Sequence, residues 1–200
     1  METINSDRIA TICVYCASSS ELSTTYINIA RELGAIIGKK GFRLVTGAGL
    51  TGLMGAVVEG AMEFGAQTLG IIPQFMIDNG WHNQKMSKII PVKDMHDRKK
   101  VMADISDGFI ALPGGYGTME EFLEIITWKQ LGLISKPLVI LNANEYYSSL
   151  LEQLSRAVDE RFVKKEHHRV WMVAKTPQGA VDMLLSPNSQ GDPISKPPIK

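Results

Sequence analysis

The most specific chemical signal in the sequence is a glycine-rich run, Leu112-Pro113-Gly114-Gly115-Tyr116-Gly117-Thr118-Met119-Glu120-Glu121. Its three glycines allow backbone conformations that other residues resist. A helix that begins here presents unpaired amide N–H groups and the positive end of its dipole. Such a loop can bind an anion. Because the lysine of a Walker loop is absent, the run favours a monophosphate over a triphosphate.

The same run also allows an interpretation without a ligand. The segment Thr118-Met119-Glu120-Glu121 has the T-x-x-E spacing of a capping box. In a capping box, Glu121 would only reach back to the N–H of Thr118 and fix the start of a helix. Spacing alone does not separate these two interpretations.

A second glycine-rich turn, Gly47-Ala48-Gly49-Leu50-Thr51-Gly52, has the G-x-G-x-x-G spacing of a dinucleotide site. A nicotinamide site also needs an acidic residue at the end of the following strand, and that strand ends Ile71-Ile72-Pro73-Gln74. We therefore expect no nicotinamide cofactor. Gly47 and Gly49 remain candidates for a turn that lets another nucleotide approach the backbone. In a purely structural role, the later glycines would let a helix pack closely on the sheet.

A third polar turn, Ala17-Ser18-Ser19-Ser20, follows the first apolar run. Its N–H groups and hydroxyls, those of Ser18 among them, could hold a phosphate or a ribose. Serine is also an ordinary N-cap residue, so a structural role as a helix cap stays open.

These turns must be positioned by a regular scaffold, and the pattern of the chain predicts one. Short apolar runs rich in β-branched residues alternate with longer segments of helical period, which is typical of an α/β fold with a doubly wound, Rossmann-like parallel sheet flanked by helices. Strands are expected over residues 9–16, 42–46, 68–72, 108–112, 137–141 and 170–173. Helices are expected over 23–39, from about 50, from about 96, and over 118–131, 145–162 and 178–185.

In such sheets ligands bind outside the carboxyl ends of the strands, which is where the three turns lie. The stretch 74–93 is the least regular part of the interior, and we expect it to form a loop over the site. We expect a single domain over residues 1–185, followed by a flexible C-terminal tail over 186–200.

The composition narrows the class of protein. The 200 residues include 21 Lys and Arg and 21 Asp and Glu, and 44% are apolar, which disfavours disorder and a nucleic-acid partner. Apolar stretches fall short of the roughly 20 residues that span a bilayer, and the first eight residues lack the features of a signal peptide. We expect a cytoplasmic protein that does not contact a membrane.

Cysteine and histidine offer two further signals, and neither favours a functional site. Cys13 and Cys16 lie in one predicted strand, about 10 Å apart and on opposite sides, so we expect reduced, buried thiols and no redox pair. The adjacent pair His167 and His168 has no third ligand nearby. We expect a solvated turn there and no metal site.

Three segments together carry a resemblance to a known family. They are Met95-His96-Asp97-Arg98-Lys99-Lys100-Val101-Met102, the glycine-rich run, and Ile125-Ile126-Thr127-Trp128-Lys129-Gln130-Leu131-Gly132. The sequence closely resembles the LOG family of cytokinin-activating phosphoribohydrolases, whose members are often labelled lysine decarboxylases. The P-G-G-x-G-T-x-x-E signature is complete from Pro113 to Glu121, and the similarity reaches about Leu185.

The resemblance implies a homodimer that needs no cofactor and hydrolyses the N-glycosidic bond of an adenosine 5′-monophosphate, or of its N6-substituted cytokinin form, to the free base and ribose 5-phosphate. It implies that Arg98 and Glu121 are the catalytic pair. The substrate-contacting positions that it implies are Lys99, Gly114, Gly115, Tyr116, Gly117, Thr118, Glu120 and Thr127. Plant members carry an acidic residue in the loop where this chain has Asn79-Gly80-Trp81-His82-Asn83, so recognition of the base is where a difference is expected.

The implied pair suits the implied chemistry. Cleavage of a ribosyl bond builds positive charge on the sugar, which a carboxylate such as Glu121 can stabilise, or it can activate the attacking water. Arg98 stays protonated and can hold Glu121, the 5′-phosphate, or both. The alternative from another class is a non-catalytic nucleotide-binding carrier or sensor on the same scaffold. A decarboxylase would need a lysine that binds pyridoxal phosphate, and no such cofactor motif accompanies Lys99 and Lys100.

Overall fold

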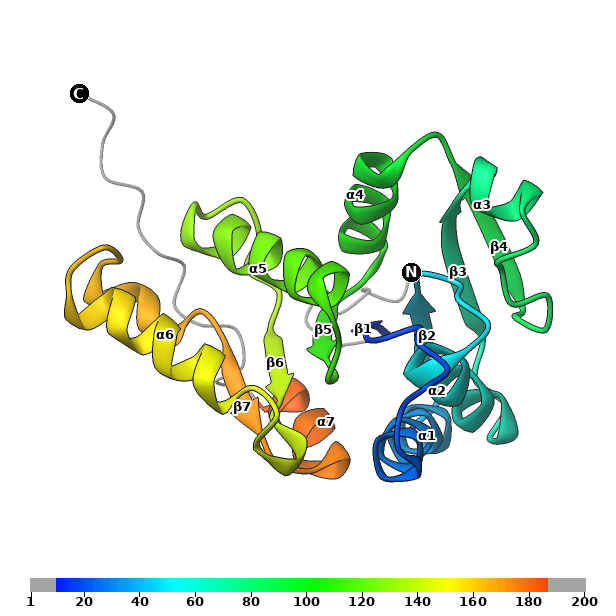
Figure 1. Cartoon of the computed structure of the whole chain (residues 1–200), viewed down its shortest axis with the longest axis horizontal. Helices are drawn as coiled ribbons and strands as arrows, with labels where there is room; N and C mark the ends of the chain where they lie inside the picture. Colours follow the sequence, from blue (N-terminus) through cyan, green and yellow to red (C-terminus); the bar gives the residue numbers. More distant parts are fainter. Residues whose placement is uncertain (1–9, 187–200) are drawn as a thin grey trace, which may run out of the picture.

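The computed structural model of the chain describes residues 10–186. Its centre is a seven-stranded sheet in which every neighbouring pair of strands is parallel, in the order β4-β3-β2-β1-β5-β6-β7 (Figure 1). The strands are β1 (Thr11–Tyr15), β2 (Arg43–Thr46), β3 (Thr68–Pro73), β4 (Lys88–Val92), β5 (Gly108–Ala111), β6 (Leu138–Leu141) and β7 (Met172–Ala174). The predicted α/β fold with a parallel, Rossmann-like sheet is confirmed.

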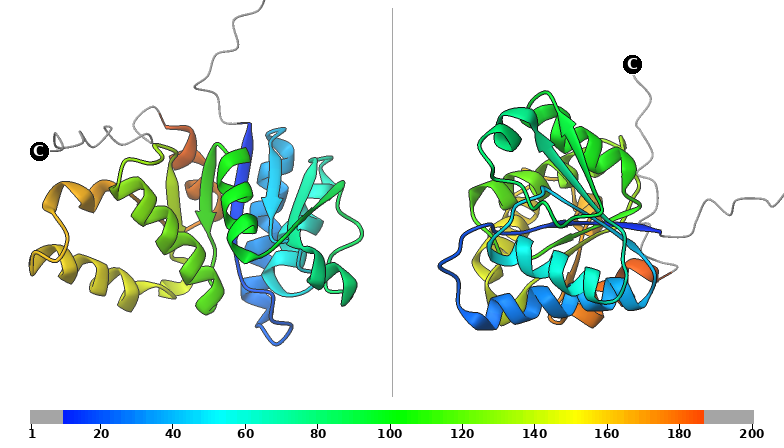
Figure 2. Two further views of the ribbon diagram at one scale, coloured as in Figure 1. Left: turned by 90° about the horizontal axis from the view of Figure 1, so that it is seen from above. Right: turned by 90° about the vertical axis from the view of Figure 1, so that its right-hand side faces the viewer.

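Helices cover both faces of the sheet (Figure 2). They are α1 (Thr24–Lys39), α2 (Gly52–Glu63), α3 (Gln74–Asp78), α4 (Met95–Ile105), α5 (Tyr116–Gln130), α6 (Ser148–Asp159) and α7 (Pro177–Leu185), with two 3₁₀ turns, η1 (Ala143–Glu145) and η2 (Lys165–Arg169). One apolar layer joins the sheet to α1, α2 and α7, and the other joins it to α4, α5 and α6.

Strand β1 lies in the middle of the sheet and is buried along its whole length. Its side chains alternate between the layers, with Val14 packed toward α1 and α2 and Tyr15 toward α4 and α5. Cys13 and Cys16 are both free thiols, and they belong to opposite layers. The prediction of two buried thiols that face opposite sides is confirmed.

The order of the strands determines where a ligand can bind. The chain moves outward from β1 to β4 and then returns to place β5 on the other side of β1. This reversal is a topological switch point, where the loops at the carboxyl ends of β1 and β5 diverge and leave a crevice.

The stretch 74–93 differs from the prediction of an irregular loop. It contains the short helix α3 and the strand β4, which pairs with β3 in parallel register, Ile72 opposite Pro91. Proline lacks the N–H that a central strand needs, and so it obscured the pattern of a strand; at the edge of a sheet, proline is tolerated. Only residues 79–87 and Lys93 of this stretch lack a helix or strand, apart from an isolated bridge between Gly49 and His82.

The remaining boundaries agree to within a few residues, with one informative exception. The helix expected over 145–162 spans only Ser148–Asp159, because η1 precedes it and holds Asn144 and Glu145 at positive φ. The expected tail 186–200, except Ser186, and the first residue of the first expected strand, Ile9, lie outside the described residues.

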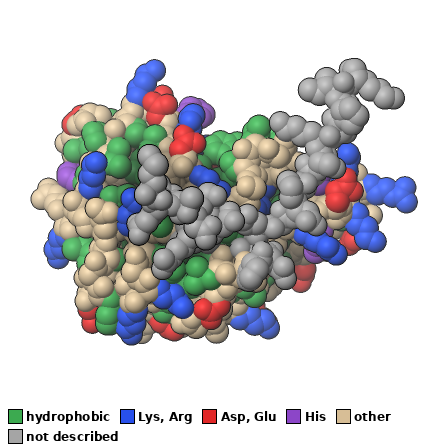
Figure 3. Space-filling model, turned by 180° about the vertical axis from the view of Figure 1, so that it is seen from behind, with side chains coloured by type: hydrophobic (Ala, Val, Ile, Leu, Met, Phe, Trp, Pro, Cys, Tyr) green, Lys and Arg blue, Asp and Glu red, His purple; other side chains and the backbone are tan. Residues whose placement is uncertain are grey.

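Within residues 10–186, no helix combines the length and the hydropathy that a bilayer crossing requires. On the face shown in Figure 3, basic and acidic side chains are interspersed, in keeping with the balanced composition.

Helices α1 and α2 pack backbone to backbone through glycines. A Cβ atom placed on Gly34 of α1 would lie 2.0 Å from the carbonyl oxygen of Val57, and one on Gly60 of α2 would lie 2.1 Å from that of Arg31. Neither position has room for a methyl group, so these glycines allow the close packing of the layer beneath β1 and β2.

We expect Gly34→Ala to lower the free energy of unfolding by about 1–3 kcal/mol, because the methyl group forces α1 and α2 apart. Urea denaturation measures the change. The control is Gly117→Ala in α5, where an added Cβ meets no atom within 4 Å, so stability should hold or rise slightly. Equal stability of Gly34→Ala and wild type would contradict the packing argument.

Candidate active site

A cleft of about 320 Å³ opens at the switch point between β1 and β5. The loop after β1 forms one wall, α4 contributes Met95 and Arg98, and the first turns of α5 form the other wall. Of the residues singled out from the sequence, those that line the cleft are Ser18, Arg98, Gly115, Gly117, Thr118, Glu120 and Glu121. The sheet therefore brings three distant segments of the chain to one place.

The start of α5 presents free backbone donors to this cleft. The helix begins at Tyr116 with Gly115 as its N-cap, and the N–H of Met119 donates to the carbonyl oxygen of Gly115 at 3.0 Å. The amides before Met119 have no partner within the helix, as at any helix N-terminus. An added Cβ on Gly115 or Gly117 would meet no atom within 4 Å, so the space over this backbone is open.

The helix start also decides the question of the capping box. Thr118 is the third residue of α5 and not its N-cap, and no side chain caps this helix. The capping-box interpretation is therefore wrong. Thr118 instead packs against the glycine loop, where a Cβ on Gly114 would lie 2.2 Å from its Oγ1.

The carboxylate of Glu121 pairs with Arg98 across the two helices. Nη2 of Arg98 lies 3.2 Å from Oε1 of Glu121, and the side chains are only 9% and 7% exposed. Gly47 gives the guanidinium its place, since a Cβ there would lie 1.7 Å from Nη2. In this structure, the group that approaches the backbone of the second glycine-rich turn is thus the protein's own arginine.

The hydrogen-bonding capacity of Arg98 is only partly used by the described residues. Its Nη1 donates to Sδ of Met95 at 3.6 Å, a weak acceptor. Its Nε is buried and has no hydrogen-bond partner among the described residues. Arginine presents five donors in a planar fork, so Arg98 retains donor capacity beyond its bond to Glu121.

Burial raises the pKa of Glu121 from 4.5 to about 7, although the charge of Arg98 opposes the shift. The nearby carboxylates of Glu120 and Glu124 add to the rise, and Lys99 lowers it. At neutral pH the carboxyl group therefore exchanges readily between its protonated and charged forms, which suits a group that stabilises charge or transfers a proton.

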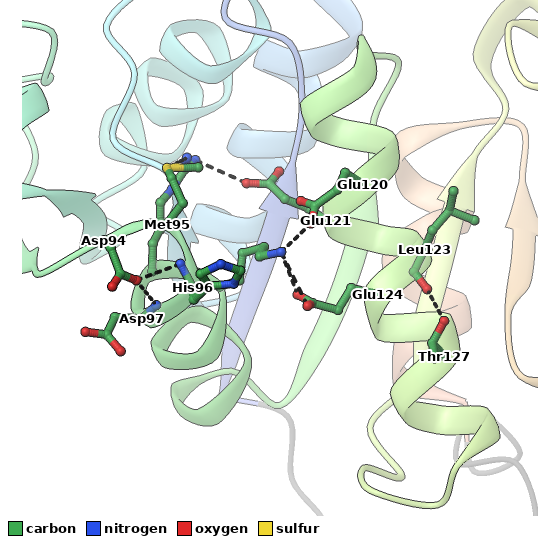
Figure 4. Close-up of polar contacts among 11 residues, drawn as sticks. Asp94, Met95, His96, Asp97, Glu120, Glu121, Leu123, Glu124 and Thr127 are labelled. Carbon is green, nitrogen blue, oxygen red and sulfur yellow. Dashed lines mark hydrogen bonds and ion pairs between the residues drawn. The ribbon is translucent and has the colours of Figure 1, made fainter.

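A second ion-pair network lies beside the first (Figure 4). The ammonium group of Lys99 bonds to Glu120 and lies 3.3 Å from Glu124, one turn further along α5. Burial opposes its charge, but the hydrogen bonds to the two carboxylates outweigh this and raise the pKa of Lys99. The network ties α4 to α5 next to the cleft.

Helix α4 starts at a fixed point because Asp94 caps it. The Asp94 carboxylate accepts hydrogen bonds from the N–H groups of His96 and Asp97 at 2.9 and 3.0 Å, and these bonds lower its pKa (Figure 4). This cap fixes the helical turn from which Arg98 points into the cleft.

The remaining candidates lie outside the lining of the cleft. The N–H of Gly49 donates to Sδ of Met54 at 2.8 Å, and the side chain of Tyr116 is 89% exposed. Thr127 lies further along α5, where its hydroxyl donates to the carbonyl oxygen of Leu123 at 2.9 Å (Figure 4). Six residues separate Thr127 from Glu121, about 9 Å of helix rise.

Two methionines that line the cleft, Met54 and Met95, were not expected there. Met95 lies within a segment that carries the family resemblance, and Met54 lies two residues beyond the second glycine-rich turn. Methionine at helical spacing is typical of a core, so its type carried no signal of a site.

The histidine pair differs from the expected solvated turn. His167 in η2 is buried, with 7% of its surface exposed, and only His168 is exposed. Within residues 10–186, no group of three or more His, Cys, Asp or Glu side chains is arranged to hold a metal ion.

Comparison with known proteins decides the family. Residues 54–184 match the family described as "Possible lysine decarboxylase". The chain is 42% identical to the probable cytokinin riboside 5'-monophosphate phosphoribohydrolase LOGL3 of Oryza sativa subsp. japonica, over 88% of this chain and 84% of that protein. It is 41% identical to LOG5 of Arabidopsis thaliana, also named a cytokinin riboside 5'-monophosphate phosphoribohydrolase, over 92% and 80%. The chain belongs to the LOG family.

Solved structures place this LOG-family chain in a wider fold group. The molybdenum cofactor binding protein of Rippkaea orientalis superposes with a TM-score of 0.68 at 24% identity, over 90% of this chain and 98% of that one. The molybdenum cofactor carrier protein of Chlamydomonas reinhardtii gives a TM-score of 0.67 at 23% identity, over 89% and 99%. At this identity, the likeness shows the fold alone.

We expect the carboxyl group of Glu121 to titrate near pH 7 in the free protein, and Arg98→Met to raise its pKa further, because the arginine charge is lost. Carbon-13 NMR of the labelled glutamates measures both midpoints. A midpoint between 4 and 5 in the wild type would contradict the burial argument. Because its folded pKa is raised, Glu121 makes the free energy of unfolding fall as pH rises from about 4.5 to about 7, and wild-type urea titrations should show this.

Proposed function

We propose that this protein hydrolyses the N-glycosidic bond of an adenosine 5′-monophosphate, with or without a cytokinin substituent on N6, to the free base and ribose 5-phosphate. The observation that carries the proposal is the buried pair of Arg98 and Glu121 in a cleft whose wall is the start of α5. The names of the LOG relatives support the same class of reaction.

In the proposed complex, the 5′-phosphate binds the free N–H groups at the start of α5. Backbone donors and the helix dipole favour an anion there, and Gly115 and Gly117 leave room for it. Glu121 lies three residues beyond Thr118, close to one helical turn, so the sugar of a docked nucleotide extends toward its carboxylate.

The bond between C1′ and the base nitrogen then breaks, and its electron pair leaves with the base. Positive charge builds on the ribose, where the carboxylate of Glu121 stabilises it. Water adds to C1′ and its proton passes to the carboxylate. The departing base takes up a proton from solvent, and the carboxyl group returns its proton to solvent before the next turnover. Arg98 keeps part of the Glu121 population ionised, because its charge lowers a pKa that burial raises.

The decarboxylase description fits the site less well. Pyridoxal phosphate chemistry needs a neutral lysine amine that can form a Schiff base. Lys99, the lysine next to the cleft, is paired with Glu120 and Glu124, and these bonds raise its pKa and hold the proton.

We expect purified protein to release adenine from AMP, with kcat/KM rising as the pH passes through about 7, because the ionised form of Glu121 is the active one. Chromatography of the free base measures the rate. Glu121→Gln should remove most of the activity and this rise with pH. Glu59→Gln, a surface carboxylate paired with Arg31, is the matched control and should behave as wild type.

Tight AMP binding without release of adenine over hours would favour the carrier or sensor alternative over the enzyme. Activity of Glu121→Gln equal to wild type would refute the assigned mechanism.

We expect Arg98→Ala to lower kcat/KM by about 100- to 1000-fold, as for the loss of one donor that stabilises charge in the transition state. Arg98→Lys keeps the charge but loses the planar fork, so partial activity should return. A loss smaller than about 5-fold in Arg98→Ala would limit Arg98 to a structural role.

The homodimer implied by the family resemblance is part of the proposal. Sedimentation equilibrium measures it directly.

A further inference from the structure

A tyrosine outside the cleft donates a hydrogen bond to the glycine-rich run. Tyr146, just after η1, donates to the carbonyl oxygen of Gly114 at 2.8 Å. Its neighbour Tyr147 donates to the carbonyl oxygen of Leu112, also at 2.8 Å. Two consecutive tyrosines thus hold two backbone carbonyls immediately before α5, and neither residue lines the cleft of Arg98 and Glu121.

The hydrogen bond from Tyr146 also orients the N–H of Gly115, on the opposite side of the same peptide group. The carbonyl of Gly114 and the N–H of Gly115 belong to one planar trans peptide, so they point in opposite directions. Tyr146 and Gly114 line an adjoining apolar hollow of about 250 Å³ and not the cleft, whereas Gly115, like Ala17 and Ser19, borders both. Because the carbonyl is fixed toward Tyr146, the N–H of Gly115 points away from Tyr146.

The turn that presents the two tyrosines is strained. Asn144 and Glu145 have φ values of 51° and 60°, in the left-handed region that residues with a side chain resist. Asn142 holds the turn in this shape, since its side chain accepts from the N–H of Tyr147 at 2.7 Å and donates to Ser148 at 3.2 Å. Backbone strain of this kind persists where the surrounding structure over-determines it, often at functional sites.

We propose that Tyr146 is a positioning residue for the 5′-phosphate, because its hydroxyl holds the Gly114–Gly115 peptide with the Gly115 N–H directed at the anion. The inference rests on the proposed function, in which the start of α5 binds the phosphate. The hydrogen bond also polarises the peptide, which strengthens the N–H as a donor.

The role of the hydroxyl can be separated from that of the ring. The ring of Tyr146 packs edge-on against Tyr147 and Tyr26, with centroid distances of 4.9 and 6.0 Å. Tyr146→Phe keeps these contacts and removes only the bond to Gly114. Tyr26→Phe is the matched control, since Tyr26 lines the same apolar hollow from α1 and has no side-chain hydrogen bond to the loop among the described residues.

The test is calorimetric titration with ribose 5-phosphate, which has the phosphate but no bond to cleave, and with adenosine, which has no phosphate. We expect Tyr146→Phe to weaken binding of ribose 5-phosphate by about 5- to 10-fold, the usual value of one hydrogen bond, and to leave adenosine unchanged. Tyr26→Phe should bind both as wild type does. In turnover of AMP, the loss should raise KM and leave kcat nearly constant.

The outcomes distinguish the two proposals. Wild type that does not bind ribose 5-phosphate overturns the phosphate site, and this inference with it. Wild type that binds it while Tyr146→Phe binds equally well overturns only the role of Tyr146. Phosphate binding that depends on Tyr146, without turnover of AMP, supports this inference and rejects the enzyme.

Nitrogen-15 NMR gives a readout that does not depend on a variant. Ribose 5-phosphate should move the amide resonance of Gly115 downfield in the wild type and leave that of the distant Gly65 unchanged. A Gly115 resonance that does not move would refute the direction assigned to its N–H.

Discussion

The site depends on one desolvated ion pair. Arg98 and Glu121 come from different helices, and each needs the other, because an unpaired buried charge costs several kcal/mol. The pair therefore holds α4 against α5 in the lining of the cleft. It also sets the chemistry, since burial raises the pKa of the carboxyl while the guanidinium restrains that rise. One contact thus links the packing of the helices to the proton affinity of the residue proposed to act.

The parallel sheet makes this contact attainable. The switch point leaves an opening beside β1. The cap on α4 fixes the start of the helix that carries Arg98, and the glycine-rich run fixes the start of α5. Gly47 removes the last obstacle, because a side chain there would occupy the position of the guanidinium. Glycine thus serves the site in two ways. Gly115 and Gly117 leave open space over the start of α5, and Gly47 leaves room for the guanidinium of Arg98.

Much of the architecture could be predicted from the sequence, since alternation of β-branched runs and helical periods reports burial directly. Strand β4 was missed because Pro91 breaks the pattern, and only its place at the sheet edge, a tertiary property, makes proline acceptable. Most residues of the cleft, and the pair of Arg98 and Glu121, were expected from motifs and from the family resemblance. The contacts of Gly47 with Arg98 and of Tyr146 with Gly114 were not, because they join segments far apart in the chain. The capping box failed because α5 starts two residues before Thr118.

Pro91 in the edge strand β4 also affects how the sheet can pair with other molecules. An edge strand offers unpaired backbone groups to any other extended chain, which is a route to aggregation. In β4, Lys88 and Pro91 are both exposed, so one end of the strand carries a charge and the other lacks a donor. A strand from another molecule that pairs with β4 would bury Lys88, and Pro91 could donate no backbone hydrogen bond to it. The β4 edge of the sheet therefore disfavours pairing with a strand from another molecule.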